Sequence, residues 1–255
     1  MVVYTFEEML FEEEERAVKT FFDRLYRNTQ TEFFSLAENR LQNEERMFIV
    51  TANPEIFMHA EGNEELSQLL LDPAATLIAD GIGIVKGARM LGIPVKERIP
   101  GVELSEFLLA SCAKLEKSVY LFGANDEVLE RLTRVLAEKH PGLTIVGTTD
   151  GYTQDKDAVF EEIKMLRPDL VLVALGVPQQ EKLIYRYINE FDKGIFVGVG
   201  GSFDVLSGTK ARAPKLFIRL NLEWLYRILK EPSRLKRFYR NNVKFLFRIK
   251  KMKKG

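Results

Sequence analysis

The chain has 255 residues, 46% of them hydrophobic and 29% charged, which is typical of a soluble globular protein long enough to bury a large core. Its single cysteine, Cys112, excludes an internal disulfide, and the sequence has neither a His/Cys metal cluster nor an apolar run long enough to span a bilayer. The 37 basic and 37 acidic residues cancel, but residues 210–255 hold 16 Lys and Arg against two Glu, so we expect this end to meet an anionic partner.

The first part of the chain predicts two helices and then a strand. Residues 5–45 are rich in Glu, Leu and Phe, and the predicted helices are broken near residues 28–31. Met47–Val50 predicts a short buried strand, and the proline four residues later suits the first turn of a helix. Thr51 and Asn53 stand at this junction, where their side chains could cap the helix or line a ligand site.

Asp80 stands where the next predicted strand gives way to a helix. Residues 76–79 have strand character, Gly81 and Gly83 follow the aspartate, and an apolar helix continues to Gly92. The carboxyl edge of an open α/β sheet binds ligands, and glycines there let a ligand approach the backbone. An aspartate at this point also makes a good helix cap, so the local sequence leaves capping and chemistry both open.

The rest of the first 209 residues alternates strands with helices. The predicted strands lie within residues 118–125, 143–152, 169–177 and 194–201, and the predicted helices between them cover residues 102–117, 126–139 and 155–166. Continuous apolar strands that alternate with helices predict an α/β fold with a Rossmann-like, mostly parallel sheet and helices on both faces.

The ends of these strands should meet at one edge of the sheet, because parallel strands share their carboxyl edge. A single crevice would then be surrounded by Thr51, Asn53, Asp80, Gly123, Gly176, Gln180, Gly198, Gly200, Gly201 and Asp204.

The basic end of the chain predicts helices with separate apolar and charged faces. One helix should begin at Pro214 and another after Pro232. The second carries Leu235, Phe238, Tyr239, Val243, Leu246 and Ile249 on one face, with Arg234, Arg237, Arg240, Lys244 and Arg248 among the remainder. Such a basic amphipathic helix is typical of binding to an anionic membrane surface, with packing on its own domain or a second subunit, or binding to nucleic acid, as alternatives. We therefore divide the chain into residues 1–209, with 1–45 as a helical segment, and an appendage, residues 210–255.

Several reactions are disfavoured because their motifs are missing. A G-x-G-x-x-G fingerprint after an early strand, a Walker phosphate loop and a G-x-S-x-G elbow are all absent. The Asp155-Lys156-Asp157 sequence could hold a metal against a diphosphate, but acids in a first helical turn are expected for dipole reasons alone. We expect no metal and no other cofactor, so Arg98 and the arginines of the appendage would stabilise a departing diphosphate.

A series of short segments makes the prediction more specific. The chain contains, in this order, TANPEIF, ADGIGIV, ERIPG, LFGA, ALGVPQQEK, GVGGSFDVLSG, RAP and LEWLYRILKEPSRLKR. Together they resemble the bacterial WecG/TagA/CpsF glycosyltransferase family, which includes N-acetylmannosaminyltransferases of wall teichoic acid synthesis. The resemblance covers residues 48–240, and the first 45 residues depart from the family pattern.

The resemblance implies an inverting, metal-independent transfer of a sugar from a UDP-sugar donor to a polyprenyl-diphosphate-linked sugar at the inner face of the cytoplasmic membrane. It implies Asp80 as the general base, with Thr51 close to the reacting centre and Asn53 beside it. Arg98 and Gln180 correspond to pocket residues. The arginines that would complete the site from the appendage are Arg212, Arg219, Arg227, Arg234 and Arg237.

These expectations agree with the residue chemistry. A carboxylate that accepts a proton helps a sugar hydroxyl to attack an anomeric carbon, and a lipid-linked acceptor requires membrane contact without a spanning helix. We therefore expect a cytoplasmic protein, peripheral on the inner face of the membrane, with no nucleic acid partner; a homo-oligomer is compatible with the sequence. The alternatives are another UDP-hexose or a UDP-uronic acid as donor, a nucleotide-sugar epimerase, and a non-catalytic protein whose basic end binds membrane or nucleic acid.

Overall fold

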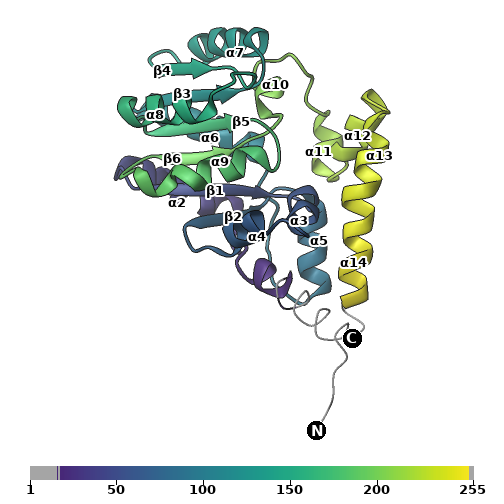
Figure 1. Ribbon diagram of the computed structural model, residues 1–255. Helices are drawn as coiled ribbons and strands as arrows, with labels where there is room; N and C mark the ends of the chain where they lie inside the picture. Colours follow the sequence, from purple (N-terminus) through teal and green to yellow (C-terminus); the bar gives the residue numbers. More distant parts are fainter. Residues whose placement is uncertain (1–15, 17, 253–255) are drawn as a thin grey trace.

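The computed structural model describes residue 16 and residues 18–252, and its centre is a parallel six-stranded sheet (Figure 1). The strand order is β2-β1-β6-β5-β3-β4, and every neighbouring pair is parallel. The strands are β1 (Met47–Ala52), β2 (Ala75–Ala79), β3 (Ser118–Gly123), β4 (Thr144–Thr149), β5 (Leu170–Ala174) and β6 (Ile195–Gly198). The predicted α/β fold class is confirmed.

Helices cover both faces of the sheet, because its central strands are apolar on both sides. All six residues of β1 are buried, and the strand extends two residues beyond the predicted Met47–Val50. One face packs against α3 (Pro54–Ala60), α4 (Glu64–Leu71), α5 (Ile82–Met90), α8 (Lys156–Leu166) and α9 (Gln179–Tyr187), which is followed by the short η1 (Ile188–Glu190). The other packs against α2 (Gln30–Gln42), α6 (Gly101–Lys114), α7 (Asp126–Lys139) and α10 (Ser202–Leu206).

The break predicted near residues 28–31 is confirmed. Residues 18–23 are helical, and α2 begins after a capping box in which Thr29 and Glu32 bond each other's backbone N–H groups. The earlier part of the first predicted helix, residues 5–15 and 17, lies outside the described residues.

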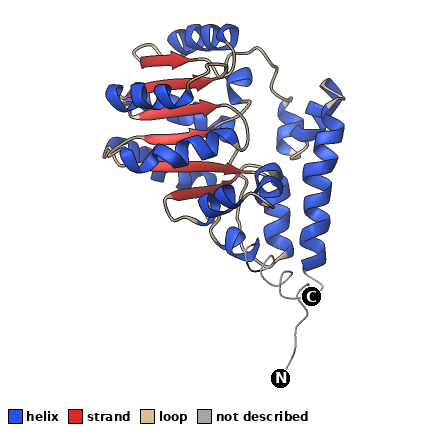
Figure 2. Ribbon diagram, viewed as in Figure 1, coloured by secondary structure: helices blue, strands red, loops and turns tan. Residues whose placement is uncertain are grey.

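The appendage consists of short helices beside the carboxyl edge of the sheet. They are α11 (Lys215–Arg219), α12 (Glu223–Lys230), α13 (Arg234–Phe238), the π-helical turn η2 (Tyr239–Val243) and α14 (Lys244–Met252). Figure 2 shows them standing along the edge toward which all the strand arrows point. The first predicted appendage helix is in fact two, because Asn221 adopts a left-handed backbone conformation between α11 and α12. Over the described residues, no helix is both long and apolar enough to cross a bilayer.

The apolar side chains of the last helices are divided between the domain and the surface. Phe245 and Ile249 of α14 are fully buried, and the Phe245 ring packs on Phe57 of α3 at 5.0 Å between centroids. Leu235 and Phe247, by contrast, are 58% and 66% exposed. The prediction of one membrane-facing stripe is therefore wrong for Ile249, which packs on the domain as in the alternative interpretation.

Candidate active site

Asp80 lies directly after β2 and binds a helix distant in sequence. Its Oδ1 accepts a hydrogen bond of 2.8 Å from the N–H of Gly101, the first residue of α6. The following helix, α5, has Gly81 at its N-cap, and no described side chain caps it. Asp80 therefore does not cap its own helix, and that alternative is wrong. Its carboxylate instead ties the end of β2 to the start of α6.

The glycines after Asp80 make room for a neighbouring helix. A Cβ atom at Gly83 would lie 2.6 Å from Cγ of Pro54, and one at Gly81 would lie 2.9 Å from Cδ of the same proline. The sequence suggested that a ligand approaches the backbone at these two glycines. The start of α3 occupies that space instead.

Thr51 and Asn53, at the end of β1, have different tasks. The Thr51 hydroxyl is buried and donates to the carbonyl oxygen of Gly198 at 2.8 Å, joining β1 to the end of β6. Asn53 Oδ1 accepts from the N–H groups of Glu55 and Ile56 at 2.9 and 3.1 Å. Asn53 is thus the cap of α3, and Thr51 is not.

Gln180, at the start of α9, connects two glycine-containing loops. Its Oε1 accepts from the N–H of Gly176 and from that of Gly200, both at 3.0 Å. Its Nε2 donates to Glu181 Oε1 at 2.7 Å, and its side chain is buried. A Cβ at Gly198 would lie 2.7 Å from Gln180 Nε2, so the glycine is required for this approach. Gln180 therefore holds the loops after β5 and β6 together, and its role as a pocket residue stays a prediction.

Glu181 is a site residue that the sequence analysis missed. Its side chain has no solvent exposure, and its Oε2 has no hydrogen-bond partner among the residues that the structure describes. Burial raises the pKa of Glu181 to about 7, and the negative charge of Glu55 acts in the same direction. An acid in the first turn of a helix usually faces solvent, and no feature of the sequence distinguishes this one from a solvated acid.

The appendage completes the surroundings of Asp80 through α12. Glu223 is the first residue of α12, and its Oε1 accepts a hydrogen bond of 2.7 Å from Arg227 Nη2. The Oε2 atom of Glu223 lies 3.5 Å from Nη1 of Arg98. The Glu223 side chain is 7% exposed and that of Arg98 14%. Arg98 comes from the loop before α6, so the domain and the appendage meet at this carboxylate. Glu223 is the second site residue that the sequence analysis missed.

The charges around Asp80 oppose one another. Burial raises the pKa of Asp80 above the ordinary aspartate value, and Glu223 adds to the rise, while the Gly101 N–H, Arg98 and Arg227 act to lower it. Burial acts to raise the pKa of Glu223 as well, but Arg227, Arg98 and Arg212 hold it below its usual range. Asp80 is therefore a stronger proton acceptor than an exposed aspartate, and cationic groups stand beside it.

The remaining predicted residues lie around this centre at different distances. Arg212 pairs with Glu103 in the first turn of α6, and Asp204 Oδ2 lies 3.2 Å from Lys210 Nζ. Gly201 is exposed at the start of α10. Arg219 is exposed, and its guanidinium makes no ion pair within residues 18–252, so the structure does not bring it to Asp80.

The Asp155 to Asp157 motif has structural partners. Asp155 caps α8 by accepting from the Ala158 N–H at 2.9 Å, and Asp157 lies 3.0 Å from Nη1 of Arg186. In the part of the chain that the structure describes, no three His, Cys, Asp or Glu side chains are grouped as metal ligands would be. The interpretation of this motif as a helix start is confirmed.

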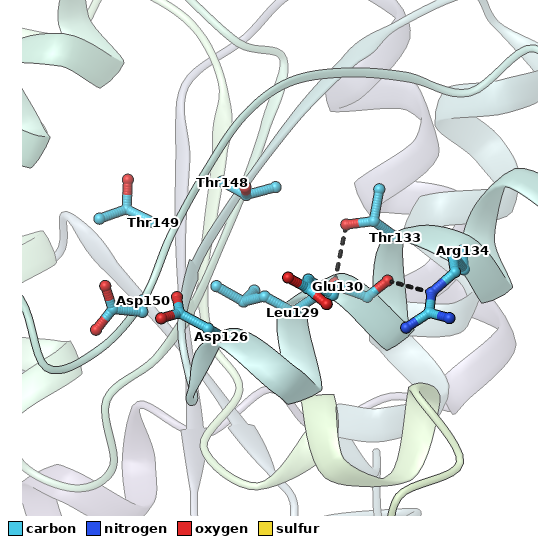
Figure 3. A pocket seen from close by; sticks show the side chains of 8 residues that line it. All are labelled: Asp126, Leu129, Glu130, Thr133, Arg134, Thr148, Thr149 and Asp150. Carbon is cyan, nitrogen blue, oxygen red and sulfur yellow. Dashed lines mark hydrogen bonds between the residues drawn. The ribbon is translucent and has the colours of Figure 1, made fainter.

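A separate open hollow of about 660 Å³ lies between α7 and the edge strand β4. It is lined by Asp126, Leu129, Glu130, Thr133, Arg134, Thr148, Thr149 and Asp150. Figure 3 shows the Thr133 hydroxyl and the Arg134 guanidinium bonded to carbonyl groups of their own helix. None of the predicted site residues lines this hollow, and the active site at the ends of β1, β2 and β6 stays a prediction.

The fold and this site define a class of protein. A carboxylate with a raised pKa, flanked by arginines at the carboxyl edge of a parallel sheet, suits transfer of a group from a phosphate-bearing donor. Residues 19–255 match the glycosyl transferase WecG/TagA/CpsF family. The chain belongs to this family, and it is a glycosyltransferase.

The chain is also similar to individual members of this family. The chain is 40% identical over 208 residues to the N-acetylglucosaminyldiphosphoundecaprenol N-acetyl-beta-D-mannosaminyltransferase of Bacillus spizizenii, covering 81% of this chain and 80% of that protein. It is 40% identical over 189 residues to the protein of the same name from Bacillus subtilis, covering 74% and 73%. The Staphylococcus aureus (strain MW2) protein of that name is 35% identical over 213 residues, covering 84% and 83%.

Proposed function

We propose that this enzyme transfers N-acetylmannosamine from a UDP-linked donor to N-acetylglucosamine on undecaprenyl diphosphate, with inversion at the anomeric carbon and without a metal ion. The acceptor and the transferred sugar follow the names of the relatives. The observation that carries the mechanism is that Arg98 and Arg227, which both lie against Glu223, also interact electrostatically with Asp80.

The proposed reaction is a single displacement. The acceptor hydroxyl oxygen forms a bond to the anomeric carbon, the bond from that carbon to the diphosphate oxygen breaks, and UDP leaves with the electron pair. Asp80 accepts the hydroxyl proton, which requires its ionised form. Its raised pKa makes this transfer more favourable than it would be to an exposed aspartate.

Arginines would take the role that a metal ion has in other transferases. Arg98 and Arg227 carry fixed positive charge beside Asp80, where they would offset the negative charge that develops on the leaving diphosphate. Thr51 and Gln180 would position the same site, because they hydrogen-bond to the end of β6 and to the loop that follows it. In this mechanism the arginines stabilise the leaving group, and Asp80 takes the proton from the acceptor.

The appendage suits an acceptor held in a membrane. Exposed apolar side chains on its helices include Leu216, Leu220, Leu229, Leu235, Tyr239 and Phe247. They stand among the basic residues of the same segment. Apolar side chains would enter the acyl boundary and the cations would bind anionic headgroups, placing the site at the inner face of the membrane.

Release of UDP from UDP-N-acetylmannosamine, with a lipid-diphosphate-linked N-acetylglucosamine acceptor, tests the substrate and the metal independence together. We expect turnover to be unchanged by EDTA and to be much faster than with UDP-N-acetylglucosamine. Loss of turnover in EDTA, restored by a divalent cation, would contradict the metal-free mechanism. A preference for another UDP-hexose or a UDP-uronic acid would replace the proposed donor.

A further inference from the structure

We propose that Glu223 occupies the diphosphate position between Arg98 and Arg227 in the unliganded enzyme, and that the donor diphosphate displaces it. This inference rests on the proposed function, because it takes a nucleoside diphosphate sugar as the ligand.

The first argument is geometric. Glu223 contacts two guanidinium groups that come from different parts of the chain, Arg227 at 2.7 Å and Arg98 at 3.5 Å. The two arginines and the carboxylate also interact electrostatically with Asp80, the proposed base. An anion that bridges Arg98 and Arg227 would take the position of the Glu223 carboxylate, which contacts both guanidinium groups.

The second argument concerns charge. The positive charges of Arg227, Arg98 and Arg212 all act on the one carboxylate of Glu223, whose side chain is nearly buried. A diphosphate carries more negative charge than a carboxylate and accepts more hydrogen bonds from guanidinium groups. It is thus the stronger partner for the same arginines, and the exchange leaves the Glu223 side chain free to turn away from them while Arg227 stays in place.

A simpler role for Glu223 would be to fasten α12 to the domain through Arg98. The two roles differ in the sign of their effect on diphosphate affinity. Removal of a competing anion strengthens UDP binding, whereas removal of a fastener lets Arg227 leave the site and weakens it.

The experiment is calorimetric titration of the full chain with UDP and with uridine. Glu223→Gln keeps the shape of the side chain and removes its charge, so we expect UDP to bind on the order of ten-fold more tightly, with uridine affinity unchanged. Glu223→Asp, which withdraws the carboxylate from Arg98, should tighten UDP binding to a smaller extent. The matched control is Glu190→Gln. Glu190 lies in η1 and pairs with Lys164 of α8, so removal of its charge should leave UDP affinity within about two-fold.

Each outcome decides between the two roles. Weaker UDP binding in Glu223→Gln, or equal tightening for uridine, would overturn the proposal. If Glu223→Gln does not fold, Glu223→Asp decides by the same sign. Failure of the wild type to bind UDP would instead count against the proposed function, so the two failures are distinguishable.

Discussion

Asp80 is partly buried and Glu181 fully buried at one edge of the sheet, and their surroundings give them different tasks. Arg98 and Arg227 act on Asp80, which keeps an ionised form accessible for proton transfer. The hydrogen bonds that act to lower the pKa of Glu181 come from the Gln180 amide and the Glu181 backbone, and within the described part of the chain Glu181 Oε2 is unpaired. We infer that Asp80 reacts with the acceptor, whereas Glu181 orients the Gln180 amide.

The buried acid makes a prediction about stability. With a folded pKa of about 7 against an ordinary value of 4.5, Glu181 keeps its proton in the folded chain after the unfolded chain has released it. Its contribution to stability is therefore full below pH 4.5 and is lost as the pH rises to about 7, a change of about 3 kcal/mol. Glu181→Gln cannot ionise, so urea unfolding should show the variant gaining stability relative to wild type from pH 4.5 to 7.5. Parallel pH curves for the two proteins would contradict the buried environment.

The sequence predicted which residues lie at the carboxyl edge of the sheet, because they stand where a strand ends. Thr51 is near the end of β1, Asn53 and Asp80 directly follow β1 and β2, and parallel strands bring such positions to one edge. The sequence left open what each side chain contacts. Glu181 and Glu223 were missed because their burial depends on packing between segments distant in sequence, and their neighbours in sequence resemble those of solvated helix acids.

At the scale of single elements, α14 shows how one amphipathic helix can serve two partners. Phe245 was absent from the predicted apolar face, yet it is the fully buried aromatic side chain that docks the appendage against Phe22 and Phe57. Gly87 of α5 permits this contact, because a Cβ there would lie 2.9 Å from the Phe22 ring and 3.1 Å from the Phe245 ring. A helical period identifies a face, but it does not identify what covers that face.

Substitutions of two phenylalanines on α14 should therefore affect different properties of the protein. Phe245→Ala removes a fully buried ring and should lower the free energy of unfolding by about 3–5 kcal/mol in urea titrations. Phe247→Ala, its exposed neighbour on the same helix, should cost less than about 0.5 kcal/mol but weaken co-sedimentation with anionic vesicles. Equal losses of stability in both variants would contradict the docking, and unchanged vesicle binding in Phe247→Ala would contradict the membrane role of that surface.

At the scale of the whole molecule, the appendage brings positive charge to the edge where the strands end. The acidic first 209 residues and the basic last 46 meet through pairs that join α12 to Arg98 and Arg237 of α13 to Glu55 of α3. The alternation of strands and helices was enough to predict the fold class. The strand order and the docking of the appendage depend on contacts between distant segments, which no local pattern encodes. The predicted boundary after residue 209 falls in the connection between α10 and α11.

The most direct test of this account is UDP release from UDP-N-acetylmannosamine and the lipid-linked acceptor, comparing wild type, Asp80→Asn and a chain that ends at residue 209. We predict that Asp80→Asn lowers kcat by about 10²–10⁴-fold while UDP affinity is retained, because only the proton acceptor is lost. The truncated chain, which lacks Arg227, should lose turnover and UDP affinity together. Turnover that is unaffected by Asp80→Asn would contradict the account and return Asp80 to a structural role at the start of α6.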